Sequence, residues 1–229
     1  MLKLDLQFFG GRGSSSAGGG SGGGGGKTGS GYGGKGVPLG LAGQTYFEDG
    51  NKTSVSGTLD FWEGKSKDLP KEQLLMVDED GFACGYFKGG ATAVSFVIPK
   101  GVDPSKTVLT HNHPYGGKDG RTIGGTFSDA DLKNHIGLGF KESRATSIEG
   151  TYSFKAAKGK KQNAVGFLAA LKKRDPEVSK KADAKYKKAQ AKGSSKSYID
   201  TWLECHHEWY KANCSKYGYD YSFTKAKKI

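Results

Sequence analysis

Two histidines separated by one residue stand in the stretch Thr110–Pro114, and a Ser-Asp-Ala-Asp sequence follows downstream. On an extended segment the side chains of His111 and His113 point to the same side. Asp131, at the start of a following helix, is placed to supply a third ligand. Two imidazoles and one carboxylate are typical of a catalytic zinc site that keeps one coordination position open. The sequence therefore predicts a Zn²⁺ ion held by His111, His113 and Asp131.

A strand and a helix must position these side chains. The segment 107–110 is short, apolar and β-branched, and it follows the turn sequence at 101–104, so it reads as a buried strand. Pro114 ends that strand. Ser128 is placed as the N-cap of a helix whose first turn, from Asp129, is acidic. The two histidines are thus expected at the strand end, facing the start of the helix.

A hydrolytic metal site also needs a carboxylate that accepts a proton from water. Glu72 begins the stretch 72–86, in which an apolar strand, an acidic Gly-containing turn and a return strand predict a hairpin. Glu72 is therefore the candidate base. Glu63, Asp78 and Glu79 remain alternatives, because the segment between Glu72 and His111 is short.

The order of Glu72, a hairpin, the His-Asn-His-Pro segment and Ser-x-x-Asp resembles the JAMM (MPN+) metalloprotease domain. The His-Asn-His-Pro form is most similar to its bacterial RadC-like and toxin-associated branches. The resemblance implies that Glu72 is the general base and that Ser128 helps to stabilise the oxyanion. It also assigns the zinc ligands to His111, His113 and Asp131.

The resemblance extends over roughly residues 60 to 155. This chain carries an additional Gly-rich loop at 115–125, and its stretch between Glu72 and His111 is shorter than the family pattern. The family implies an α/β fold: a mixed β-sheet with flanking helices in JAMM/MPN-like (cytidine-deaminase-like) layers. It further implies zinc-dependent hydrolysis of a peptide or isopeptide bond in a protein or peptide substrate.

Residues 1–40 and 41–229 differ in composition. Gly and Ser dominate positions 10–40, which cannot bury a core and are expected to form a disordered, flexible tail. Residues 41–229 are sufficient for one JAMM/MPN-like domain with a helical insertion.

The opening sequence MLKLDLQFFGG resembles the leader of head and structural proteins of phages and prophages. This resemblance implies a phage-encoded protein in the bacterial host cytoplasm or associated with the virion, with virion proteins as partners. The segment is too short, and too interrupted by Asp5, for a signal peptide or membrane span. It is expected to be either a docking strand or a disordered start. Gly10-Gly11 resembles the diglycine that some relatives cleave, so self-processing is a further hypothesis.

The Lys-rich region at about 158–196 accounts for much of the basic charge of this protein, which has 35 Lys and Arg against 23 Asp and Glu. It predicts one helix over 164–171, ended by Asp175-Pro176, and a second over 177–190. A helix over 197–213 and strands near 151–155 and 217–223 make this region an insertion within one domain. The net charge of +12 predicts weak nucleic-acid contact at most, since aromatic side chains are not interleaved with the lysines.

Three cysteines, Cys84, Cys205 and Cys214, form no disulfide-rich pattern and favour a reducing compartment. Cys205 and Cys214 with His206 and His207 could form a second metal cluster, but their helical spacing favours an amphipathic helix. Two alternative functions remain. One is a phage head or structural protein with a non-catalytic metal site, and the other is a metal-dependent nuclease-type toxin.

Overall fold

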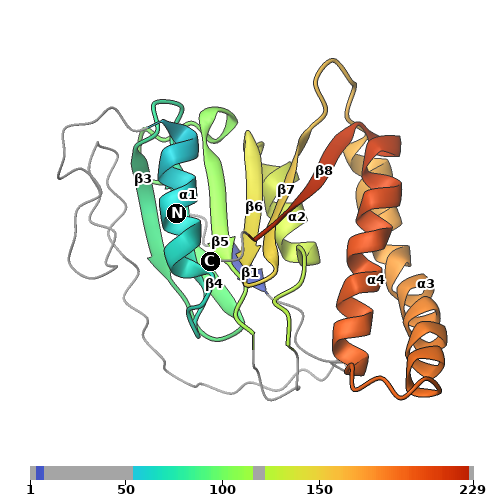
Figure 1. Ribbon diagram of the computed structural model, residues 1–229. Coiled ribbons are helices and arrows are strands. Elements are labelled where there is room, and N and C mark those ends of the chain that lie inside the picture. Colours follow the sequence, from blue (N-terminus) through green and yellow to red (C-terminus); the bar gives the residue numbers. More distant parts are fainter. Residues whose placement is uncertain (1–3, 8–53, 116–121, 227–229) are drawn as a thin grey trace, which may run out of the picture.

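A mixed sheet forms the centre of the computed structural model, which describes residues 4–7, 54–115 and 122–226 (Figure 1). Its strand order is β3-β2-β5-β6-β7-β8. β5 and β6 are parallel, and every other neighbouring pair is antiparallel. The strands are β2 (Gln73–Val77), β3 (Ala83–Lys88), β5 (Val108–Asn112), β6 (Glu142–Ser147), β7 (Gly150–Ala156) and β8 (Tyr219–Lys225). The predicted α/β class with a mixed sheet is confirmed.

Helices flank this sheet on both faces. They are α1 (Val55–Ser66), α2 (Asp129–Leu138), α3 (Ala164–Gln190) and α4 (Tyr198–Asn213), with short 3-10 turns at Pro104–Lys106 and Cys214–Tyr217. α1 covers β2 and β5 on one face, α2 lies on the other face, and α3 and α4 stand side by side at the β8 end (Figure 1). Within the described ranges, no helix combines the length and apolarity needed to cross a bilayer.

A second, two-stranded sheet pairs β1 (Leu4–Gln7) with β4 (Ala93–Phe96) in antiparallel register. The N-terminal segment was expected to be either a docking strand or a disordered start. In the structure, Leu4–Gln7 forms a strand. The predicted Gly/Ser-rich tail and the boundary near residue 40 fall almost entirely outside the described residues.

The local predictions around the site are confirmed. The hairpin is β2–β3, whose turn contains Gly81 at φ 90°, a left-handed conformation that favours glycine. The apolar strand is β5, and the helix with the acidic first turn is α2, with Ser128 as its N-cap. These elements form where expected because their signals, a turn glycine and a helix cap, are local in the sequence.

The expected break at Asp175-Pro176 is wrong. α3 runs without interruption from Ala164 to Gln190 and contains Pro176. Proline removes one helical hydrogen bond and crowds the carbonyl four residues earlier, at a cost of about 3 kcal/mol. Packing of α3 against α4, with Phe167, Leu171 and Val178 buried on either side of the proline, offsets that cost.

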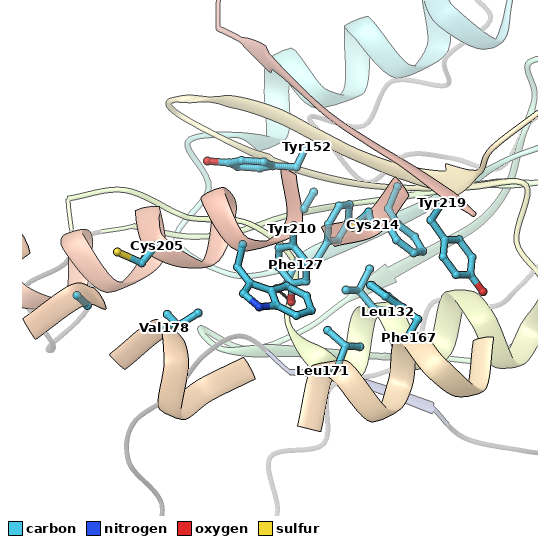
Figure 2. Packing of buried hydrophobic residues seen from close by; sticks show 14 residues of the cluster. Phe127, Leu132, Tyr152, Phe167, Leu171, Val178, Cys205, Tyr210, Cys214 and Tyr219 are labelled. Atoms are coloured by element: carbon cyan, nitrogen blue, oxygen red, sulfur yellow. Dashed lines mark hydrogen bonds between the residues drawn. The ribbon is translucent and has the colours of Figure 1, made fainter. Parts of the chain in front are cut away.

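α3 and α4 leave the sheet after β7 and return to it as β8, which pairs with β7 along its whole length. The largest apolar cluster fills the space between the α2 face of the sheet and these two helices. Figure 2 shows Phe127 and Leu132 from the α2 side packed with Phe167 and Leu171 of α3 and Tyr210 of α4. Each such side chain contributes about 1.5–3 kcal/mol on burial. The helical pair is therefore part of the core.

All three cysteines are buried and free. Burial raises the pKa of the Cys84 and Cys214 thiols to about 12. Both thiols stay protonated at neutral pH, so they are poor nucleophiles.

His135, in the last turn of α2, makes the fold sensitive to acid. Burial lowers its pKa to about 4, while Ser143 Oγ lies 2.9 Å from its Nδ1 and the Phe154 ring packs against it. Between pH 6.5 and 4 the unfolded chain binds a proton that the folded chain does not, so stability falls as the pH falls. Because of His135, the free energy of unfolding should fall by about 2–3 kcal/mol as the pH is lowered across that window.

We therefore expect His135→Asn, which can keep the bond to Ser143, to lose less stability between pH 7 and pH 4 than the unsubstituted protein. Urea unfolding at several pH values measures the difference. Parallel pH profiles for the two proteins would contradict this account.

Candidate metal centre

The end of β5 fixes both histidines. β5 is buried between β2 and β6, with His111 paired to Leu74 on one side and Ala145 on the other. The ladder continues past the strand, because the His113 backbone N–H donates to Thr146 O at 2.7 Å. Alternate residues of a strand face the same side. Both imidazoles therefore project from the α2 face of the sheet.

The N-terminus of α2 fixes Asp131. Ser128 Oγ accepts a hydrogen bond from the Asp131 N–H at 3.2 Å, and Asp131 Oδ2 accepts one from the Ser128 N–H at 2.6 Å. This reciprocal pair is a capping box, which holds the carboxylate against the first turn of the helix.

The three side chains meet as the sequence predicted. His111 Nε2 and His113 Nε2 are 2.9 Å apart. Asp131 Oδ1 lies 3.5 Å from His111 Nε2, and Asp131 Oδ2 lies 3.7 Å from His113 Nε2. Ligands of a tetrahedral zinc ion at ~2.1 Å are roughly 3.4 Å apart. This group can therefore hold a metal ion, and in the described part of the chain no other His, Cys, Asp and Glu cluster of this kind is found.

The protonation states also fit a metal. His113 Nδ1 lies 3.2 Å from Gly125 O, which fixes the proton on Nδ1 and leaves the Nε2 lone pair for a ligand bond. Burial lowers the pKa of His113, which keeps the ring neutral. Burial alone would raise the pKa of Asp131, but His111 and His113 outweigh it and hold that pKa well below its usual range. Neutral imidazole and carboxylate are the metal-binding forms.

Glu72 precedes β2 and is buried. Its N–H donates to Gly90 O at 2.7 Å, and its carbonyl accepts from the Gly89 N–H at 2.8 Å. Leu74, two residues after Glu72, lies opposite His111 in the β2–β5 register. Glu72 therefore lies at the same end of the strands as the two histidines.

Asn112, between the two histidines, bonds the end of β5 to the backbone that precedes β2. Its Oδ1 accepts from the Gln73 N–H at 2.7 Å, and its Nδ2 donates to Lys71 O at 3.1 Å. The backbone on both sides of Glu72 is thus bonded to the residue between the ligands.

The alternative bases lie elsewhere. Glu63, on α1, is paired with Arg144 at 2.6 Å and accepts a hydrogen bond from Thr110, whose side chain faces away from the histidine side of β5. Asp78 and Glu79 lie in the β2–β3 turn, at the opposite end of β2 from the metal centre. Of the four carboxylates, Glu72 is the one next to the end of β2 that pairs with His111.

Arg174 of α3 braces the first turn of α2, a contact that no sequence pattern predicted. Its guanidinium is almost fully buried, with Nη2 2.7 Å from Asp129 Oδ1, and it also donates to Tyr210 Oη. Tyr210 Oη in turn donates to Phe127 O at 3.1 Å. In the sequence, an arginine in a Lys-rich segment is expected to be exposed to solvent. Only the fold shows that Arg174 is buried and holds the residues around Ser128.

Glu149 holds the loop that orients His113. Its carboxylate accepts from the backbone N–H groups of Gly124 and Gly125 at 3.1 and 2.6 Å. Gly125, whose carbonyl bonds His113, adopts φ 80°, and a Cβ there would lie 2.8 Å from the Leu203 side chain. A glycine is therefore required at the point where this loop supports the metal ligand.

The Cys205–Cys214 region is helical, as the amphipathic pattern favoured. Cys205 and Cys214 pack in the main apolar cluster. The His206 ring is buried against Trp202, and His207 Nδ1 lies 2.7 Å from Tyr221 Oη. These contacts show that the two cysteines and the two histidines pack in and around the core.

Comparison with known proteins identifies no family for this chain. No family model matches it, and no curated protein and no solved structure matches it. Any functional conclusion therefore depends on the geometry of the site.

Proposed function

We propose that this protein is a zinc-dependent hydrolase of the JAMM/MPN+ type, acting on a peptide or isopeptide bond. The supporting observation is the buried trio of His111, His113 and Asp131, whose donor atoms converge. Two imidazoles and a carboxylate leave a fourth position of a tetrahedral ion for a reacting group. A zinc ion bound there supplies Lewis-acid chemistry, which makes water acidic near neutral pH and polarises a carbonyl.

Glu72 serves as the general base in this proposal. Glu72 lies two residues before Leu74, the strand partner of His111, and this position at the histidine end of β2 supports the role. In that role the carboxylate would accept a proton from water and return it to the leaving amine. Burial among the strand ends limits competing water around that carboxylate.

Ser128 serves as the donor to the developing oxyanion. Its Oγ accepts the Asp131 N–H, so the lone pairs are partly used by the helix cap while the hydroxyl hydrogen can still be donated. A hydroxyl held by a capping box is preorganised, which is the condition for stabilising charge in the transition state.

The substrate in this proposal is a protein or peptide. A phage-encoded protein in the host cytoplasm, with virion proteins as partners, remains the expectation from the leader sequence. The lysines support nucleic-acid contact only weakly, because Lys181 and Lys185 of α3 are paired with Glu208 at 2.8 and 2.5 Å.

Glu72→Gln tests the hydrolase directly. We expect it to reduce the rate of peptide hydrolysis by a factor on the order of 10²–10⁴, the usual contribution of a general base. Zinc content should be unchanged, because Glu72 is not a ligand. Hydrolysis of a mixed peptide library by the zinc-loaded protein, followed by mass spectrometry, measures the rate. Glu79→Gln is the matched control, since Glu79 is an exposed carboxylate at the other end of β2. Equal rates for Glu72→Gln and the unsubstituted protein would exclude this role.

A stabilising, non-catalytic metal site is the second candidate. The side chains of His111, His113 and Asp131 are each only 1–2% exposed, as in metal sites that serve structure. In that case chelation lowers the melting temperature, while no peptide in the library is cleaved with or without zinc.

A further inference from the structure

β4 belongs to the small two-stranded sheet, in which its partner is β1. Leu4 is opposite Phe96, Asp5 opposite Ser95, and Gln7 opposite Ala93. In the sequence, the Gly-rich stretch 8–53 separates β1 from the next described element, α1. In the sequence, β1 is therefore far from the strand with which it pairs.

β4 itself is firmly anchored. Val94 and Phe96 are fully buried, and the Phe96 ring packs against Phe87 and Phe140. The turn before β4 is tight, because a Cβ at Gly89 would lie 2.2 Å from Ala93 O. The edge that receives β1 is thus set by the core of the domain.

The direction of β1 links it to the metal centre. Ala93 O, opposite Gln7, accepts from the Gly90 N–H at 2.8 Å, and Gly90 O accepts from the Glu72 N–H at 2.7 Å. Two hydrogen bonds therefore connect the Gln7 end of the strand pair to Glu72. β1 also contacts α2, the helix that carries Asp131 (Figure 1). A chain running from Leu4 to Gln7 along β4 thus advances toward the Glu72 end of the site.

The pairing of β1 with β4 is expected to be reversible. A four-residue strand makes few hydrogen bonds, each contributing about 0.5–1.5 kcal/mol net. A linker of Gly-rich composition supplies an effective concentration of only about 1 mM. A strand held this weakly exchanges with a free peptide of the same sequence. When β1 dissociates, the backbone N–H and C=O groups at the edge of β4 lose their partners and can pair with another strand.

We propose that β4 is a docking edge for an extended peptide, with Leu4–Gln7 as its resident strand. A peptide of the same sequence added in trans displaces this strand by antiparallel β-augmentation. If the site is the hydrolase proposed above, on which this consequence rests, the docked peptide presents its carboxyl-terminal side to Glu72.

A disulfide lock in the full chain tests the docking edge. Asp5→Cys and Ser95→Cys place two thiols directly opposite, at the ~4.5–5.5 Å Cα separation of antiparallel partners, which suits a disulfide. The three native cysteines are buried, so the introduced pair should react. The probe is a fluorescein-labelled peptide with the sequence of residues 2–9, in metal-free buffer, read by fluorescence polarisation. We expect the reduced protein to bind the peptide and the oxidised protein to bind at least 10-fold more weakly.

Asp5→Cys with Ser105→Cys is the matched control, because Ser105 is exposed in the 3-10 turn before β5 and is not opposite Asp5. It should neither cross-link within the chain nor change peptide binding on oxidation. Failure of the Asp5–Ser95 pair to cross-link, absence of peptide binding to the reduced protein, or equal binding by both redox forms would each overturn the proposal. Binding is measured without metal, so docking with no hydrolysis after zinc is added would count against the hydrolase alone.

Discussion

Replacing Arg174 with methionine is expected to lower the free energy of unfolding by about 1–3 kcal/mol, the usual cost of leaving a buried hydrogen-bonding group such as the Tyr210 hydroxyl without its charged partner. The Arg174 guanidinium lies 2.7 Å from Asp129 and 2.9 Å from Asp175, and it donates to Tyr210. Methionine fills much of the volume but leaves Asp129 and Tyr210 without this partner. Urea unfolding at neutral pH measures the loss.

The same substitution should also weaken zinc binding at the metal centre. Asp129 begins α2, so a shift of this turn would move Asp131 and lower zinc affinity by roughly 10–100-fold, as for other residues that orient ligands. Lys173→Met is the control, because Lys173 is an exposed neighbour on the same helix. Equal stabilities for the two variants would show that Arg174 does not brace the fold.

Zinc is expected to raise the melting temperature of the metal-free protein by roughly 10 °C when it is present at about 1,000 times its dissociation constant. The reason is that the ion binds only the folded arrangement of His111, His113 and Asp131. Asp131→Asn should lose most of this gain. Asparagine preserves the shape and can still accept the Ser128 N–H of the capping box, but it removes the charge that binds the ion. Thermal unfolding with zinc and with a chelator measures both effects.

The control for this prediction is His207→Ala, which removes a half-buried histidine on α4 outside the trio. Its response to zinc should equal that of the unsubstituted protein. An equal response in Asp131→Asn would instead place the stabilising zinc at another site.

Local signals explain why the core of the site was predictable from the sequence. A β-branched run ending in His-x-His gives a strand end with both rings on one face. Ser128 and Asp131 at N-cap and N3 spacing give a capping box, which fixes the carboxylate within one turn. Neither prediction required knowledge of distant contacts.

The remaining features depend on contacts between distant parts of the chain. The position of Glu72 depends on the register between β2 and β5, which the sequence does not specify. The continuity of α3 through Pro176 depends on packing against α4, and the burial of Arg174 depends on where that packed pair meets α2. The placement of β1 on β4 depends on an edge formed by residues almost ninety positions later in the chain.

The metal content of the purified protein, measured by mass spectrometry alongside His113→Ala, tests the central claim most directly. We predict one zinc ion per chain in the unsubstituted protein and its loss in the variant, since His113 contributes one of the three converging donors. A well-folded protein that contains no zinc, even after reconstitution, would contradict the metal centre and the hydrolase derived from it.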